Sequence, residues 1–356
     1  MTSGSASRAT KRGSVIRWVF TISFCVAAIA AIVFGSAWLY RTFWGPGAFV
    51  ERYIERLAVG DAAGALEMPG VAPEYSELDA IDRGQASEAL LRSATLTSDI
   101  DDVHVVDEKS DDGGSFAVEL SYTLDGSAAQ MTFRVSREGF DGLVPAWRFE
   151  VPPLSVVDLT VRGSWRFSVN GFEMDKRQIS PSGTGADPLE PVSMLAFTPG
   201  NYAVAVDTAA TTASPTNVSA ASPLGIVPLD VQTMPTDQLV DVVQKSVDDF
   251  LDGTCTTQSV LHPSGCPFGA PNDVSDLGIA QDDVAWTIVD YPMTRLVPDG
   301  DSWNVAPANG KARLTLTVYD YFTGALVNVE RDVYFTMVAD VDVREDGDVH
   351  ITIDAV

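Results

Sequence analysis

The first 41 residues combine a short basic tail with one long apolar run, which constrains the fold more than any other feature of the chain. Residues 18–40 contain no charged side chain. Four basic residues lie ahead of them: Arg8, Lys11, Arg12 and Arg17. At about 1.5 Å of rise per residue, a helix of this length spans about 34 Å, enough to cross a bilayer core of about 30 Å. The positive charges favour a cytoplasmic tail at residues 1–17. The sequence therefore predicts a single-pass transmembrane helix, a signal-anchor, at residues 18–40, with the C-terminal domains extracellular.

Aromatic residues flank this run, where their rings favour the membrane–water interface. They are Trp18 at one end and Trp38, Tyr40, Phe43 and Trp44 at the other. A cleaved signal peptide is the open alternative, because the small residues 35–37 could form a cleavage site. The apolar run is longer than a signal-peptide core of about 7–15 residues and continues past that site. The lipid bilayer is therefore the predicted partner of residues 18–40.

The charge of the exterior part excludes one class of partner. All 49 acidic residues follow residue 41, whereas 18 of the 23 basic residues do, so this part carries a formal charge of −31. Nucleic-acid binding requires a basic surface, so we expect no nucleic-acid partner. Most acidic groups lie beside turn glycines, as on a solvated surface. Attraction of cations or of a basic partner is the open alternative.

The exterior part contains two cysteines, Cys255 and Cys266. An even pair in an oxidising compartment predicts a disulfide. A metal site formed by Cys255, His262 and Cys266 is the alternative, but it lacks a fourth ligand and any CxxC pair. We therefore expect a disulfide, no metal and no cofactor.

The hydrophobic periodicity predicts an α+β fold whose exterior begins with a domain at residues 48–152. Apolar residues at helical spacing indicate a helix from Phe49 to Gly60, and a second helix is expected at 85–92. The period then changes to two on both sides of the turn Asp125-Gly126, which is typical of a β-hairpin with one apolar face.

Two further domains are expected. Residues 153–235 are rich in Gly, Pro, Ser and Thr and contain short alternating strands, which indicates a β-sandwich-like domain with flexible loops near 180–188 and 208–222. Residues 236–356 repeat the order of the first domain, with a helix from about Thr236 to Gly253, the cysteine loop and then strands. The expected architecture is two helix-plus-antiparallel-sheet domains that flank a β-rich segment.

Three short segments carry resemblances. The segment FVERYIERLAVGDAAGALEM at 49–68 resembles the opening of ketosteroid-isomerase-like cone domains. The segment FTPGNYAVAVD at 197–207 resembles small β domains of bacterial envelope proteins. The segment GTCTTQSVLHPSGCPFG at 253–269 looks like a cysteine-loop signature of uncharacterised single-pass membrane proteins of high-GC Gram-positive bacteria. The resemblances imply two cone-like domains, a small β domain and an envelope location, and they carry over no catalytic residue.

One residue interrupts an apolar pattern. Five apolar residues alternate on one face of a predicted strand: Val327, Val329, Val333, Phe335 and Met337. Arg331 falls among them. A β-bulge or an edge position would make this arginine harmless, and an anion- or ligand-binding arginine in a pocket is the functional alternative.

No motif for catalysis is present. The sequence lacks GxSxG, SxxK, HExxH, a P-loop and a dinucleotide-binding fingerprint. We therefore predict a membrane-anchored, extracytoplasmic, non-enzymatic envelope protein that binds or scaffolds an envelope protein, a wall component or a small ligand. The alternative is an extracytoplasmic hydrolase or isomerase with an active site in a cone-shaped pocket.

Overall fold

The structure is a computed structural model that describes residues 23–24, 42–111, 113–142, 144–275, 283–319, 323–344 and 346–355. Apart from residues 23–24, the predicted span 18–40 lies outside these ranges. Within them, no helix is both long enough and apolar enough to cross a membrane. The described fold is α+β and its sheets are mostly antiparallel, as predicted.

The chain forms two compact units, and each is described by itself. Unit 1 comprises Met1–Pro73 and Ser98–Pro153, and unit 2 comprises Glu74–Thr97 and Leu154–Val356. The chain therefore passes from one unit to the other three times. The segment Glu74–Thr97 lies inside the range 48–152 predicted as the first domain, but it belongs to unit 2.

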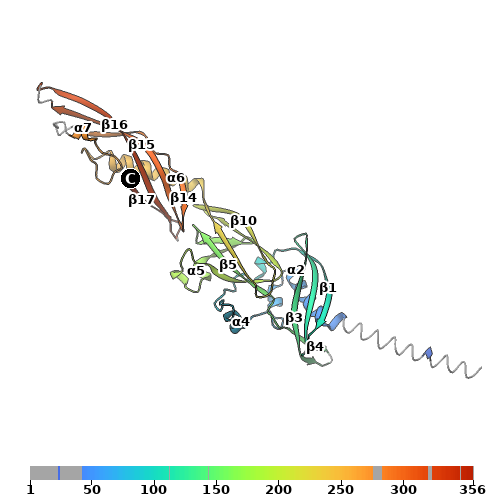
Figure 1. Ribbon diagram of the computed structural model, residues 1–356. Helices are drawn as coiled ribbons and strands as arrows, with labels where there is room; N and C mark the ends of the chain where they lie inside the picture. The colour runs from blue at the N-terminus through green and yellow to red at the C-terminus, as the bar shows by residue number, and fades with distance from the viewer. Residues whose placement is uncertain are drawn as a thin grey trace, which may run out of the picture. The chain divides into compact units, whose positions relative to one another are not determined.

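Unit 1 is a four-stranded antiparallel sheet in the order β1-β2-β3-β4, with one long helix against it (Figure 1). Its elements are α2 (Pro46–Ala58), α3 (Ala62–Leu66), β1 (Ile100–Ser110), β2 (Ser115–Leu124), β3 (Ser127–Asp141) and β4 (Val144–Phe149). The β2–β3 hairpin turns at Asp125 and Gly126, which both have positive φ, as the predicted Asp-Gly turn requires.

Aromatic rings form the core of unit 1. Tyr53 of α2 packs edge-on against Phe133 and Phe149, with ring centroids 6.2 and 5.2 Å apart. The Tyr53 hydroxyl donates a hydrogen bond of 2.8 Å to the carbonyl of Pro153. Tyr53 and both phenylalanines are buried. The helix-facing side of this sheet is therefore filled by side chains.

The first part of unit 2 contains two sheets. One has the order β12-β10-β9-β6-β7, and the other has the order β11-β5-β8 with β11 parallel to β5. The strands are β5 (Leu154–Arg162), β6 (Arg166–Val169), β7 (Phe172–Asp175), β8 (Val192–Phe197), β9 (Gly200–Asp207), β10 (Thr211–Ala220), β11 (Ile226–Gln232) and β12 (Met234–Pro235). The short helices are α4 (Tyr75–Asp79), η1 (Ser93–Thr95), α5 (Lys176–Ile179) and η2 (Gly183–Gly185). Buried residues of both sheets, among them Leu159, Phe167 and Tyr202, share one core.

Two expectations about this part are wrong. Residues 85–92 do not form a helix, because the backbone of Ser87 pairs with β8 and Leu90 is buried in the shared core. The stretch expected as a flexible loop at 208–222 contains β10, which pairs with β9 and β12. In both cases tertiary pairing decides the conformation rather than local composition.

The last part of unit 2 sets a helix against a long-stranded antiparallel sheet with the order β13-β15-β16-β17, in which β14 also pairs with β15 (Figure 1). Its elements are α6 (Asp237–Phe250), the π-helical turn η3 (Leu251–Cys255), α7 (Asn272–Ser275), β13 (Ala285–Asp290), β14 (Leu296–Asp299), β15 (Ser302–Tyr319), β16 (Leu326–Val343) and β17 (Val349–Ala355). The Thr236 hydroxyl accepts a hydrogen bond from Leu239 N–H and caps α6 where the sequence predicts a helix start. Leu239, Val243 and Val247 of α6 share a core with the sheet, so this sheet face is also filled.

Candidate functional site

Unit 2 contains a polar pocket of about 560 Å³, in the size range of small-molecule sites. It lies between the segment around α4 and the loop that joins α5 to β8. The lining residues are Tyr75, Asp79, Asp82, Arg83, Gly84, Gln85, Ala86, Asp158, Ser180, Pro181, Ser182, Glu190, Pro191 and Ser193.

An ion pair at this pocket joins residues 75 positions apart in the sequence. Arg83 Nη2 donates to Asp158 Oδ2 at 2.7 Å, and Arg83 Nε lies 3.1 Å from both carboxylate oxygens. The Ser193 hydroxyl donates to Asp158 Oδ1 at 2.6 Å. The hydrogen bond to Asp158 raises the pKa of Arg83. Asp158 is 8% exposed, so these three side chains form a fixed structure.

Local structure explains why these groups meet. Asp158 and Ser193 are register partners on the neighbouring strands β5 and β8, so their side chains share one face. On the wall that carries Arg83, a capping box between Glu74 and Glu77 stabilises the N-terminus of α4. The N–H of Arg83 then bonds the carbonyl of Leu78 at 2.8 Å and holds the turn that carries the guanidinium.

A buried lysine fastens the opposite wall of the pocket. The Lys176 side chain is 2% exposed, and its Nζ donates to the carbonyls of Pro188, at 2.7 Å, and of Glu190. Burial lowers the pKa of Lys176, and the nearby charges of Asp187 and Glu190 oppose that shift. The lysine therefore holds the end of the loop from which Ser180, Ser182 and Glu190 line the pocket.

The lining carries an excess of negative charge. Asp158 is neutralised by Arg83, whereas Asp79, Asp82 and Glu190 are exposed and form no ion pair with another described residue. The ring of Tyr75, 66% exposed, lies over Gly84, where an added Cβ would come within 2.9 Å of Tyr75 Cε2. Carboxylates beside an open aromatic face attract cationic groups such as ammonium and guanidinium.

The same groups are poorly arranged for catalysis. Asp158 already accepts three donor hydrogens, from Arg83 Nε and Nη2 and from the Ser193 hydroxyl, and the Nε hydrogen is shared between both carboxylate oxygens. Protonation of Asp158 would remove the negative charge that pairs with Arg83, so this carboxylate is a poor general base. The Ser193 proton points at Asp158, whose charge is already bound to arginine, and this arrangement does not activate a nucleophile.

Arg331, the arginine singled out from the sequence, lies on β16 and is not part of this pocket. Its side chain is 49% exposed, and its Nε lies 3.7 Å from Asp273 Oδ2 of α7. Its strand partner on β15 is Leu314. This environment is that of a solvated surface ion pair.

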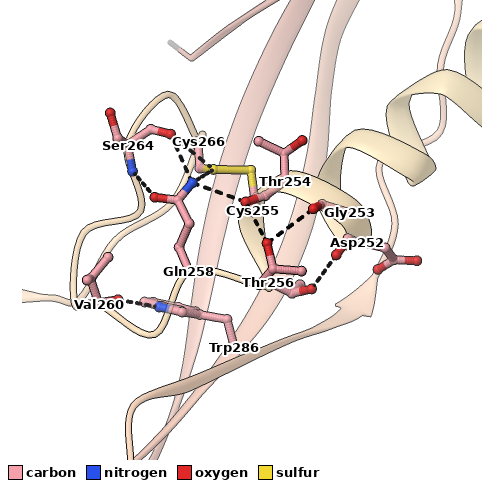
Figure 2. Close-up of a disulfide and its surroundings, with 11 residues drawn as sticks. Asp252, Gly253, Thr254, Cys255, Thr256, Gln258, Val260, Ser264, Cys266 and Trp286 are labelled. Carbon is pink, nitrogen blue, oxygen red and sulfur yellow. Dashed lines mark hydrogen bonds between the residues drawn. A yellow bond between two sulfur atoms is a disulfide. The ribbon is translucent and has the colours of Figure 1, made fainter. Parts of the chain in front are cut away.

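Cys255 and Cys266 meet after α6. Cys255 Sγ and Cys266 Sγ are 2.09 Å apart, the separation of a disulfide (Figure 2). Gln258 holds the intervening loop, because its amide donates to the carbonyls of Thr254 and Ser264 and accepts from Ser264 N–H. Trp286 Nε1 donates to the carbonyl of Val260 and ties the loop to β13. Among the described residues, no group of three His, Cys, Asp or Glu side chains is placed to hold a metal ion.

Sequence reasoning missed the pocket because it joins segments around residues 80, 158 and 190 that share no local motif. One signal was present. Asp158 interrupts the apolar strand LSVVDLTV at 154–161, and a carboxylate in such a strand needs a partner. No comparable sequence pattern identifies Arg83 as that partner. Comparison with protein-family models, with curated proteins and with solved structures finds no match to this chain.

Proposed function

We propose that this chain is a single-pass, membrane-anchored envelope protein whose exterior part binds a cationic ligand or a basic segment of a partner. In this proposal, residues 18–40 form the membrane anchor, and the exterior part contains cone-like helix-and-sheet domains and a β-sandwich-like domain. This organisation resembles that of single-pass proteins of high-GC Gram-positive bacteria. Lipid, a wall component and an envelope protein remain the proposed partners.

One observation carries the binding role. The pocket of unit 2 presents Asp79, Asp82 and Glu190 around an arginine whose charge is already neutralised by Asp158. An incoming cation meets the open ring of Tyr75 and three carboxylates that form no ion pair with another described residue. Of the nearby positive charges, Arg83 is neutralised by Asp158, and the Lys176 ammonium is buried against the carbonyls of Pro188 and Glu190. The negative charge of the whole exterior part also attracts such a ligand over a longer range.

The packing of the two helix-covered sheets favours binding over catalysis. An isomerase or hydrolase of the cone type needs an open concave face with polar groups. In the described residues, the helix-facing sides are filled, by Tyr53, Phe133 and Phe149 in unit 1 and by the core around Val243 and Val247 in unit 2.

The test compares an acetylated trilysine amide with the matching triglutamate peptide by titration calorimetry on the full chain. We expect only trilysine to bind. Asp79→Asn and Glu190→Gln should each weaken binding about two- to fivefold at low salt, the range of single exposed ion pairs. Asp82→Asn is a third variant. Asp82 has a positive φ, which asparagine also adopts readily, so the substitution should not strain the backbone.

Asp241→Asn on the exposed face of α6 is the matched control, because it removes the same charge away from the pocket. Equal losses in Asp241→Asn and Asp79→Asn would mean that trilysine responds only to net charge. That result, or equal binding of triglutamate, would contradict the proposed site.

A further inference from the structure

Unit 1 exposes aromatic side chains at its start, just after the predicted membrane span in sequence, and near the tip of one hairpin. Phe43 is 57% exposed, Trp44 is 39% exposed, and Phe140 near the tip of the β3–β4 hairpin is 61% exposed. Large apolar side chains grouped on a surface mark a place of interaction.

Hydrogen bonding and strand register bring these residues to one side of the unit. Trp147 Nε1 of β4 donates to the carbonyl of Trp44 at 2.9 Å, which fixes the start of α2 against β4. Phe140 is the register partner of Pro145, two residues from Trp147. Residues two apart on a strand, and their register partners, share a face. Phe140 therefore lies on the face that carries α2, towards the free end of the hairpin.

A cation belongs to the same group. The Arg137 guanidinium lies 5.3 Å from the centroid of the Phe140 ring, and Arg137 is the register partner of Trp147. Aromatic rings interleaved with arginine are typical of the headgroup layer of a bilayer, where the rings enter the interface and the guanidinium meets phosphate.

The distance along the chain identifies the occupant of this surface. Phe43 follows residue 40, the end of the predicted span, by three residues, which reach at most about 10 Å when extended. We propose that Phe43, Trp44, Phe140 and Arg137 form a lipid-facing edge of unit 1 that rests in the headgroup layer. The inference depends on the proposed anchor and adds a second contact with the lipid, far from the anchor in sequence.

The test uses the full chain in lipid nanodiscs, with Cys25→Ala to remove the third cysteine. Phe140→Cys carries an environment-sensitive fluorophore, and Val59→Cys, at a site 79% exposed just after α2, is the matched control. Val59 lies about 20 Å along the helix from Pro46. With lipids that carry a nitroxide at the headgroup, we expect a loss of fluorescence at position 140 and none at position 59.

Three outcomes would overturn the inference. They are no quenching at position 140, equal quenching at both positions, and, in anionic lipid, quenching at position 140 that Arg137→Ser leaves unchanged. A circular dichroism spectrum equal to that of the parent chain confirms that each variant is folded. Failure of the anchor itself would be seen separately, as chain that does not comigrate with the nanodiscs.

Discussion

Lys176 Nζ lies 2.7 Å from the carbonyl oxygen of Pro188 and thereby fastens the loop that forms one wall of the pocket. Lys176→Met keeps most of the buried stem and removes the ammonium group, which leaves the carbonyls of Pro188 and Glu190 without their donor. We expect faster thermolysin cleavage before Leu189, which is 38% exposed. Lys245→Met, at a lysine whose side chain is 73% exposed, is the control. Equal digestion of both variants would show that Lys176 does not hold the wall.

The ion pair between Arg83 and Asp158 should matter for stability. Arg83→Met leaves a buried carboxylate that retains, among the described residues, Ser193 as its one side-chain donor. We expect a loss of about 2–4 kcal/mol in the free energy of unfolding, less than for a fully buried pair because the Arg83 side chain is 30% exposed. Arg162→Met is the matched control, since Arg162 makes the same kind of bond to Asp230, 53% exposed, and should lower the free energy of unfolding far less. Chemical denaturation measures the free energy of unfolding of both variants. Similar losses would contradict the expectation that burial makes the Arg83–Asp158 pair the more important one.

Glu51 should make unit 1 sensitive to pH. Burial raises its pKa, as do the charges of Glu55 and Glu108, while the N–H of Val105 opposes the shift. Because the folded state favours the protonated form, the stabilisation is present at acidic pH and is lost as pH rises through the folded pKa. Glu51→Gln should therefore lose less stability than the parent chain between acidic and neutral pH.

The measurement for Glu51 is the free energy of unfolding across a pH series. Glu67→Gln, which removes an exposed carboxylate from the same unit, separates the effect of burial from the effect of charge. A pH dependence of Glu51→Gln identical to that of the parent chain would contradict the assignment.

The cysteine pair should stabilise unit 2. Cys255 and Cys266 are 11 positions apart, and closing so short a loop contributes about 3 kcal/mol in the chain-entropy model. Changing both residues to alanine should lower the free energy of unfolding by that order. Peptide mapping of the non-reduced protein should find the two cysteines in one linked species. Free thiols or stoichiometric zinc would contradict the disulfide.

Local patterns predicted the elements whose stability is local. The helix α2, the Asp125-Gly126 hairpin and the start of α6 at Thr236 follow from periodicity, turn chemistry and capping, each readable within a few residues. Residues 85–92 were misread as a helix because Ser87 gains its hydrogen bonds from β8, more than 100 positions away. The pocket was missed for the same reason, since its carboxylates come from segments that only the fold brings together.

The three passages of the chain between the units affect the order of folding during synthesis. Domains of a growing chain generally fold as units, starting from the N-terminus. Here Glu74–Thr97 is made before β1, yet its packing partners β5 and β8 are made only after unit 1 is complete. Arg83 therefore cannot form its ion pair, and Leu90 cannot be buried, until β5 and β8 have been synthesised. A fragment that begins at Leu154 would never contain this segment, whereas one that begins at Glu74 would retain it but also carry the strands of an unfinished unit 1.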